Sequence, residues 1–341
     1  MLAAAVPGMS RIVTEALERI PGIVVEDSGF DGRSDWVLFR ASRAGRLAAL
    51  RLRVVEDVFV EVGRTFRAEG DNPRWIAGRV WRAGRVQQAL SVWGEIVKPL
   101  SAVGTFRVVT RVLQERSFHR TDLRRQLTQV IARTRSRWKN ADPADLEVWV
   151  SEYRPGRFVA GLRLTDARMR QHDGRAVERQ GALRPTVAAA MVQLAGVPSG
   201  VLLDPCCGSG TILREALEVG WEAVGSNLDP SAVKVARRNV PAVRVRVGDA
   251  RNLVEDEGSV AACVSNLPFG RQFVVQGQAR PWLTSVLSEM ARVTRPGGRV
   301  VLLAPDIPRS TVAAELRLRA RHPIRLLGTA TTVWVYDQSG G

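Results

Sequence analysis

The feature that most constrains the fold is a regular alternation of short apolar strands and helices that begins near Val197. Strands are expected at 201–204, 223–226, 244–247, 261–266, 298–304, 324–328 and 331–336, and helices at 211–219, 231–239, 281–293 and 311–321. Such alternation predicts a mostly parallel sheet with helices on both faces. The gap between the last two strands is short, so these strands are expected to form an antiparallel hairpin at the sheet edge.

The first half of the chain lacks this alternation of strands and helices. Residues 1–100 mix a helical pattern at 11–20 with strands at 36–39 and 58–63, which is typical of a small α+β unit without a catalytic signature. From Phe106 to Arg163 the pattern is strand, helix, strand, strand, with the strands at 106–113, 146–150 and 158–164. The helix is expected to begin near Thr121 and to reach about Trp138.

Positive charge gathers around that helix. The chain has 50 Lys and Arg against 34 Asp and Glu, a formal net charge of +16. Between 107 and 139 the basic side chains are Arg107, Arg111, Arg116, Arg120, Arg124, Arg125, Arg133, Arg135, Arg137 and Lys139, opposed by Glu115 and Asp122. A surface of this charge favours phosphates. The residues predicted to bind RNA are Arg116, His119, Arg120, Arg124, Arg125, Arg135, Arg137 and Lys139.

Cysteine and histidine usage points to a reduced, cytoplasmic setting and predicts no metal site. The three cysteines are Cys206, Cys207 and Cys263, an odd number without disulfide or zinc spacing. The three histidines are scattered and are expected at the surface. No apolar run reaches the length of a membrane span, so no membrane partner is expected.

A glycine turn follows the first strand of the alternating half. Asp204-Pro-Cys-Cys-Gly-Ser-Gly-Thr211 leads directly into a helix, and Gly208 and Gly210 allow the backbone to turn tightly beside a ligand. A dinucleotide fingerprint would have a third glycine where Leu213 stands. The pattern therefore suits a cofactor with an amino-acid moiety and without a pyrophosphate.

Polar residues also follow the next two strands. Asn227 and Leu228 follow the second strand, where a polar side chain can bind ribose hydroxyls. Asp249 and Ala250 follow the third, and the carboxylate of Asp249 can accept a hydrogen bond from an adenine amino group. Together with the glycine turn these residues predict a nucleoside site at the carboxyl ends of the strands.

The fourth strand ends in Ser265-Asn-Leu-Pro-Phe-Gly270. An exocyclic amine is a poor nucleophile, because its lone pair is delocalised into the ring. The side-chain oxygen of Asn266 and the backbone carbonyl of Leu267 or Pro268 can accept its hydrogens and orient it toward a methyl group. Phe269 can stack on the extruded base. No cysteine is placed to attack a pyrimidine ring, so a direct in-line methyl transfer is expected.

These motifs resemble those of the THUMP-domain RNA methyltransferases, and most closely the members that methylate the exocyclic N2 of guanosine in tRNA. The resemblance rests on Asp204–Ile212, on Gly181-Ala-Leu-Arg-Pro-Thr-Val-Ala188 and on Asn266–Gly270, and it is specific for the last 160 residues or so. The stretch Arg116–Leu123 is similar to the start of the THUMP helix. In the first half the resemblance rests on layout alone.

The resemblance implies a Rossmann-like class I methyltransferase fold that uses S-adenosylmethionine. The domains expected from it are a ferredoxin-like α+β unit at 1–100, a THUMP-like RNA-binding domain at 101–165, a linker and leading helix at 166–196, and the methyltransferase domain at 197–341. The THUMP-like unit would bind the single-stranded 3′ end of tRNA, and acceptor-stem position six would be the target. The expected cofactor residues are Arg184, Pro185, Asp204, Pro205, Cys206, Gly208, Ser209, Gly210, Thr211, Asn227, Leu228, Asp249, Ala250 and Asn266.

One departure from the family pattern concerns Asn227, which stands where an acidic residue is usual, so the ribose loses a charge-assisted hydrogen bond. Guanine-N2 methylation of ribosomal RNA, adenine-N6 methylation and a non-catalytic RNA-binding protein with a degenerate cofactor site remain alternatives. Leu267, in place of the first proline of the adenine-type loop, argues against the second. The chain is expected to be a monomer.

Overall fold

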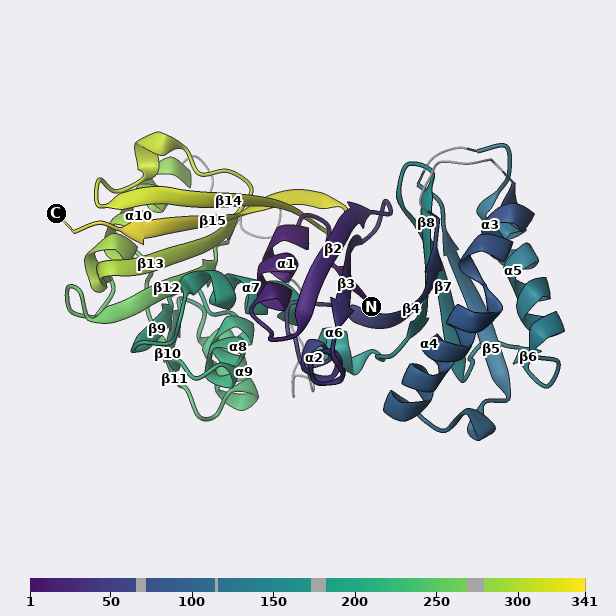
Figure 1. Ribbon diagram of the computed structural model, residues 1–341. Helices are drawn as coiled ribbons and strands as arrows, with labels where there is room; N and C mark the ends of the chain where they lie inside the picture. Colours follow the sequence, from purple (N-terminus) through teal and green to yellow (C-terminus); the bar gives the residue numbers. More distant parts are fainter. Residues whose placement is uncertain (66–71, 114–115, 173–181, 269–278, 341) are drawn as a thin grey trace. The chain divides into compact units, whose positions relative to one another are not determined.

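The computed structural model describes residues 1–65, 72–113, 116–172, 182–268 and 279–340 (Figure 1). The chain divides into two compact units, Met1–Arg170 and Gln171–Gly341. Each unit is built on a sheet of its own.

The N-terminal unit contains an eight-stranded sheet in the order β2-β3-β1-β4-β8-β7-β5-β6. Its strands are β1 (Leu2–Ala5), β2 (Ile23–Phe30), β3 (Asp35–Ala41), β4 (Asp57–Arg64), β5 (Thr105–Arg111), β6 (Lys139–Asn140), β7 (Leu146–Arg154) and β8 (Arg157–Arg163). Most neighbours are antiparallel, whereas β5 runs parallel to both β6 and β7. Trp36, Phe59 and Trp149 pack together on one face of this sheet.

The helices of this unit are α1 (Ser10–Glu18), α2 (Arg43–Ala49), α3 (Pro73–Val80), α4 (Ala83–Ile96), α5 (Arg120–Thr134) and α6 (Arg168–Gln171), with a 3₁₀ turn at Leu100–Ala102. On α5, Leu123, Leu127 and Ile131 recur every four residues and are fully buried, as the sequence pattern predicts. The helix ends four residues earlier than expected, because Arg135 leaves the helical conformation (φ −136°, ψ 63°).

The two parts expected within the first half share one sheet. Strand β4, from the first part, pairs antiparallel with β8, from the second, with Glu61 opposite Gly161. The separation of 1–100 from 101–165 stays a prediction, and so do the linker at 166–196 and the domain at 197–341. The compact unit itself begins at Gln171.

The C-terminal unit contains a seven-stranded sheet in the order β11-β10-β9-β12-β13-β15-β14. Its elements are α7 (Pro185–Ala195), β9 (Val201–Asp204), α8 (Thr211–Glu218), β10 (Glu222–Asn227), α9 (Pro230–Asn239), β11 (Arg244–Val247), β12 (Val260–Asn266), α10 (Ala279–Val293), β13 (Thr294–Ala304), a 3₁₀ turn at Arg309–Thr311, β14 (Leu316–Leu326) and β15 (Thr329–Gln338). The first five strands are parallel, and β15 runs antiparallel to its neighbours β13 and β14. The expected α/β class and the terminal hairpin are confirmed.

One expected element is wrong. The helix placed at 311–321 is a short 3₁₀ turn followed by β14, which begins at Leu316 and pairs with β15 along its whole length. The sequence carries the period of a strand here, because Arg317, Arg319 and Arg321 alternate with smaller or apolar residues. The arginines are exposed, and pairing with β15 decides the conformation.

Candidate functional site

The carboxyl ends of four parallel strands meet at one edge of the C-terminal sheet. Asp204 at the end of β9 lies opposite Gly225 of β10, and Asn227 at the end of β10 lies opposite Val247 of β11. Asn266 ends β12 on the other side of β9. The structure therefore brings the polar residues that follow these strands to a common edge, as parallel pairing requires.

The glycine turn after β9 has the backbone that only glycine adopts readily. Gly208 and Gly210 have φ values of +52° and +84°. A Cβ on Gly210 would lie 3.0 Å from Val240, whereas a Cβ on Gly208 would meet nothing within 4 Å. Gly210 is thus needed for the close approach of α9, and Gly208 leaves open space above the turn, where a ligand can lie.

Asp204 is a buried carboxylate at the centre of this edge. It is 1% exposed, and its Oδ1 accepts hydrogen bonds from the Ser265 hydroxyl (2.7 Å) and from the Cys206 N–H (3.1 Å). Burial raises the pKa of Asp204 to about 7, although both hydrogen bonds act in the opposite direction. The bond to Ser265 ties the end of β12 to the end of β9, and so it links the Asn266 loop to the glycine turn.

The residues after β10 form a compact turn. The Asn227 side-chain oxygen accepts from the Asp229 N–H at 2.9 Å, and Asp229 caps α9 through the Ser231 N–H at 2.8 Å. Leu228 between them is 67% exposed. An exposed leucine at a strand end offers an apolar surface for a flat ring, while the two polar neighbours hold the turn.

Asp249 follows β11 and is held by its own loop. Its carboxylate pairs with the Arg251 guanidinium at 2.6 Å and accepts from the Arg251 N–H at 2.9 Å. The hydrogen bond from the Arg251 side chain keeps the pKa of Asp249 below its ordinary value, so the group is an anionic acceptor near neutral pH. The neighbouring Ala250 is buried in the core.

Asn266 lines a pocket of about 320 Å³, a size suited to a small planar ligand. Arg184, which directly precedes α7, also lines it, together with Leu303 near the end of β13 and Pro305 just beyond that strand. The hairpin between β14 and β15 contributes Leu326, Leu327 and Thr329 to Thr331. The hairpin itself was expected from the sequence, but its residues were not assigned to the site, because no local pattern shows that its turn reaches the end of β12.

The loop after Asn266 is only partly described. The Leu267 side chain is buried in the core, and its N–H donates to the Leu303 carbonyl at 3.3 Å. Pro268 is half-buried. Phe269, expected to stack on the target base, lies outside the described residues.

Two of the three histidines lie in the interior of the protein. His172 and His322 are buried, contrary to the expectation of surface positions. His172 Nδ1 lies 2.9 Å from Glu215 Oε1, and Glu215 on α8 is 1% exposed. Both line a small cavity with Gly210, Thr211 and Pro185. The contact between His172 and Glu215 therefore holds the start of the C-terminal unit against α8, the helix that follows the glycine turn.

The cysteines are free thiols with little tendency to ionise. Burial raises the pKa of both Cys206 and Cys263 to about 12 and that of Cys207 further still. None of them is poised as a nucleophile near neutral pH.

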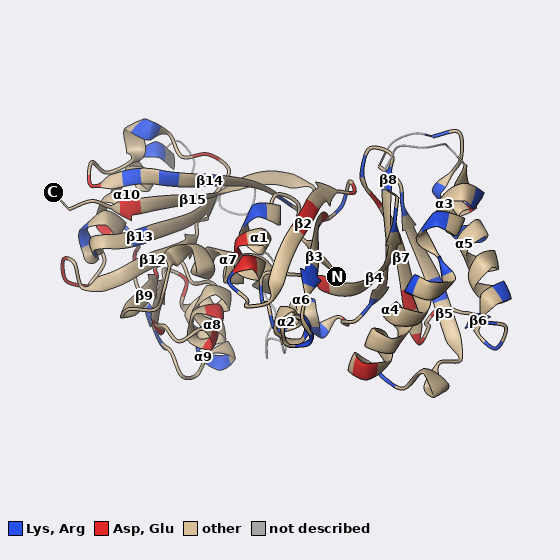
Figure 2. Cartoon of the chain, viewed as in Figure 1, with Lys and Arg blue, Asp and Glu red and all other residues tan. Residues whose placement is uncertain are grey.

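The N-terminal unit carries a groove of about 1220 Å³. Its charged lining consists of Arg33, Arg107, Arg111, Arg120, Arg124, Arg125, Asp31 and Asp142. Figure 2 shows the basic positions along α5. Arg120 and Arg124 are exposed, and the structure shows neither in an ion pair with a described residue. The charge and size of the groove are suited to a polyanion.

The other residues expected to bind RNA differ in their surroundings. His119, Arg137 and Lys139 are exposed. Arg135 donates to Gln87 Oε1 at 2.8 Å and lies over the Trp138 ring. Arg116 is largely buried, where it pairs with Glu152 and lies over Phe158. Its charge is thus engaged inside the protein.

Among the described residues, no helix has both the length and the apolar character required to cross a membrane. Within the same ranges, no cluster of three or more His, Cys, Asp or Glu residues could hold a metal ion.

The C-terminal unit is similar to a known family. Residues 172–327 match the family described as UPF0020, RMKL-like methyltransferase domain. The matched range covers most of the C-terminal unit. Its glycine turn and strand-end residues lie inside the matched range.

Three curated relatives are similar to part of the chain. The U6 snRNA (guanine-N(2))-methyltransferase THUMPD2 of Bos taurus is 36% identical over 39% of this chain and 27% of its own length. The tRNA (guanine(10)-N2)-dimethyltransferase of Methanothermobacter thermautotrophicus is 33% identical over 45% of this chain and 48% of its own. The tRNA (guanine(6)-N(2))-methyltransferase THUMP3 of Bos taurus is 32% identical over 50% and 38%. The chain spans less than half of each relative.

A solved structure matches over the whole chain. TrmN from Thermus thermophilus has a TM-score of 0.78 at 24% identity and covers 99% of this chain and 98% of its own. This likeness shows that the fold of both units is shared.

Proposed function

We propose that this protein transfers a methyl group from S-adenosylmethionine to the exocyclic N2 of a guanosine in RNA. The observation that carries the proposal is the position of Asn266: it lines a base-sized pocket, and Ser265 beside it is hydrogen-bonded to Asp204 at the glycine turn. An amine acceptor and a nucleoside-binding edge thus lie on adjacent strands of one methyltransferase domain.

The residues at the strand ends fit the proposed cofactor. Bound S-adenosylmethionine supplies a methyl group on an electrophilic sulfonium. The open space above Gly208 admits a ligand close to the backbone, and exposed Leu228 offers an apolar surface to the adenine. The anionic side chain of Asp249 accepts from the adenine amino group. Asn227 supplies the ribose contact without the charge that a carboxylate would bring.

The Asn266 loop orients the target amine. The Asn266 side-chain oxygen and the Leu267 or Pro268 carbonyl accept the two amine hydrogens, which aims the nitrogen lone pair away from them. The methyl group would pass to the amine nitrogen as its bond to sulfur breaks, which leaves a neutral thioether, and the cationic nitrogen would then release one proton to water. An amide oxygen is too weak a base to keep that proton, so Asn266 acts by position alone.

The structure offers a reason for Leu267 in this loop. Its N–H donates to the Leu303 carbonyl, and a proline at the same position would have no hydrogen to give. The Asn-Leu-Pro-Phe loop therefore suits this sheet better than the Asn-Pro-Pro loop typical of adenine-N6 chemistry. One of the three relatives is named for U6 snRNA and two for different positions of tRNA, but all three names contain guanine-N2, which supports the same choice.

We further propose tRNA as the substrate, with position six of the acceptor stem as the target. The name of THUMP3 specifies guanine 6 of tRNA, and the basic groove of the N-terminal unit supplies a surface for the RNA backbone. In this proposal the N-terminal unit includes a THUMP-like RNA-binding part, and the protein acts as a monomer in the cytoplasm. U6 snRNA and ribosomal RNA are the competing substrates.

The test is to incubate the purified protein with S-adenosylmethionine and separate pools of unmodified tRNA, U6 snRNA, ribosomal RNA and DNA. Nucleosides are then identified by mass spectrometry. N2-methylguanosine is expected in tRNA alone, and Asn266→Ala should lower its rate about 1000-fold, because positioning supplies most of the catalysis. Asn266→Asp, which retains an acceptor, should lose far less.

Calorimetry with S-adenosylmethionine separates the alternatives. Cofactor binding by Asn266→Ala at wild-type affinity would place its defect in the transfer step. Absence of both cofactor binding and methylation in the wild type would refute the enzyme and favour a non-catalytic RNA-binding protein. Appearance of N6-methyladenosine instead would refute the choice of base.

A further inference from the structure

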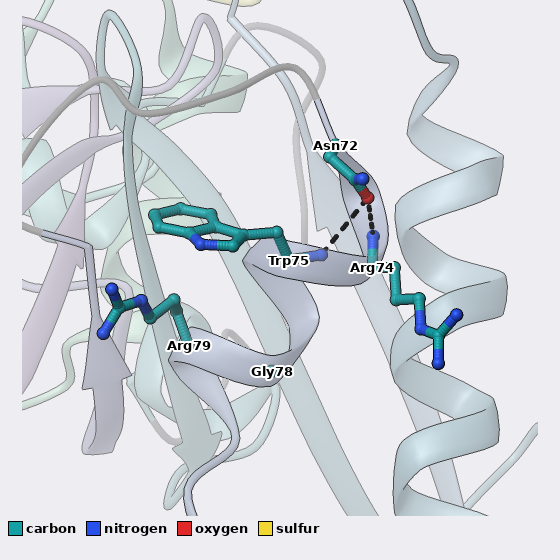
Figure 3. Close-up of a pocket in the computed structure, with 5 residues that line it drawn as sticks. All are labelled: Asn72, Arg74, Trp75, Gly78 and Arg79. Atoms are coloured by element: carbon teal, nitrogen blue, oxygen red, sulfur yellow. Dashed lines mark hydrogen bonds between the residues drawn. The ribbon is translucent and has the colours of Figure 1, made fainter.

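Helix α3 carries a second basic surface, separate from the groove beside α5. A pocket of about 400 Å³ is lined by Asn72, Arg74, Trp75, Gly78 and Arg79 (Figure 3). From Asn72 to Gly94 the chain has four arginines and no acidic side chain. No carboxylate lines this pocket among the described residues. Its ligand should therefore be an anion.

Trp75 differs from the other tryptophans of this segment. Trp81 and Trp93 are 5% and 1% exposed and belong to the core, whereas Trp75 is only half-buried and forms a wall of the pocket. The Arg79 guanidinium carbon lies 5.1 Å from the centre of the Trp75 ring. Arg79 is exposed, so it can swing away and leave the ring face to another planar group.

The helix end itself is already capped. Asn72 Oδ1 accepts hydrogen bonds from the backbone N–H groups of Arg74 (2.9 Å) and Trp75 (3.3 Å), as the dashed lines in Figure 3 show. Recognition at this pocket must therefore come from the indole ring and the two guanidinium groups. A ligand that has a flat aromatic ring and an attached phosphate can stack on the indole ring and pair with the guanidinium groups.

We propose that Trp75 is a stacking platform for an unpaired nucleotide of the RNA substrate. The base stacks on the indole in place of the Arg79 guanidinium, and Arg79 and Arg74 then pair with the flanking phosphates. The inference rests on the proposed function in that it takes RNA as the ligand. A nucleotide in the interior of a duplex cannot use this platform, because both faces of its base are covered by its neighbours.

Gly78 gives a test that removes none of the interacting groups. A Cβ on Gly78 would meet nothing within 4 Å, and the same holds for Gly84, an exposed helical glycine on α4 outside the pocket. Gly78→Leu should fill the pocket, whereas Gly84→Leu makes the same change of residue elsewhere. Both replace glycine in a helix, so neither should weaken the fold.

The measurement is the fluorescence anisotropy of a labelled single-stranded RNA of about 12 nucleotides, a length that a single-strand site can accommodate. Gly78→Leu and Trp75→Leu should each raise the dissociation constant about tenfold, while Trp75→Phe should stay within about threefold because a ring remains. Gly84→Leu should match the wild type. A blunt duplex of the same sequence should bind all five proteins alike.

Equal affinities of Gly78→Leu and Gly84→Leu would overturn the proposal. So would an equal loss of binding to heparin and to RNA in Trp75→Leu, since that result would indicate charge alone. Thermal unfolding of each variant guards against a folding defect. The assay needs no methyl transfer, so a failure of the proposed enzyme activity would appear in the nucleoside assay and leave this comparison intact.

Discussion

The strand-end site of the C-terminal unit and the basic surface of the N-terminal unit place their polar groups by different means. At the strand ends, parallel pairing fixes Asp204, Asn227 and Asn266 at one edge, whatever their side chains do. On the basic surface, neighbours decide the role of each arginine. Arg116 pairs with buried Glu152, whereas Arg124 is exposed in the groove. The same residue type thus serves the fold at one place and faces solvent at another.

A large effect is expected from Arg116→Gln, which tests whether this buried arginine stabilises the fold. Burial alone would raise the pKa of Glu152, but hydrogen bonds from Arg116, Gly156 and Leu113 lower it. Loss of the guanidinium leaves this carboxylate poorly compensated and should lower the free energy of unfolding by about 3 kcal/mol in urea titrations. Arg125→Gln, which removes an exposed pair with Asp122, should cost less than about 1 kcal/mol.

The stability difference between Arg116→Gln and the wild type should depend on pH, because the pKa of Glu152 differs between the folded and unfolded states. Because the folded-state pKa of Glu152 is depressed, its stabilising contribution is present above the ordinary glutamate pKa and is lost as the pH falls below it. The difference between Arg116→Gln and the wild type should therefore shrink in acid. Equal stability of the two proteins at pH 7 would show that Arg116 is not a structural residue.

Asp204→Asn should lower cofactor affinity and raise the stability of the fold. Titration calorimetry should show cofactor affinity reduced about 30-fold, from the loss of a charge-assisted hydrogen bond. Stability should move the other way. A folded-state pKa of about 7 against 3.8 means that Asp204 destabilises the fold as the pH rises from about 4 through 7. At pH 8 the variant should be more stable, by at most about 4 kcal/mol.

Thermal unfolding at pH 5 and pH 8 measures the predicted gain in stability. The stability gain of Asp204→Asn should be larger at pH 8, since the asparagine oxygen can still accept from Ser265 and Cys206. A variant that is less stable than the wild type at both values would show that the carboxylate has a stabilising partner.

Combined replacement of Arg120 and Arg124 by Gln should weaken RNA binding about tenfold at moderate salt. Two lost phosphate contacts should also reduce the slope of log affinity against log salt by about 1.4 to 1.8. The matched control replaces Arg19 and Arg51, which are exposed on the same unit but outside the groove. Anisotropy titrations over a salt series measure both quantities. If the two double variants behave alike, the groove is not the binding surface.

The smallest effect is expected from Asn227→Asp. A carboxylate at the end of β10 would strengthen the ribose contact, but Asp229 lies two residues away and its charge opposes a second anion. Cofactor affinity should therefore rise only about threefold, measured by calorimetry. A tenfold gain or more would show that Asp229 contributes little at this position.

The sequence predicted the C-terminal sheet better than the N-terminal surface, for a physical reason. The alternation of strands and helices permits few topologies, so the glycine turn, Asp249 and Asn266 could be assigned to one edge before any contact was known. The helix expected at 311–321 is an instructive failure. Its alternating arginines indicate a strand, but such short-range patterns are ambiguous until a partner such as β15 is in place.

The sequence by itself determined where most strands of the C-terminal unit lie along the chain and which polar residues follow them, because both depend on local periodicity and on short connections. The tertiary structure decided which of those residues are buried and which arginines are engaged. Asp204 has a raised pKa because the folded chain removes it from water, and His172 reaches Glu215 across 43 positions of sequence. The burial of these polar groups and their long-range pairing are properties of packing, and no local pattern encodes them.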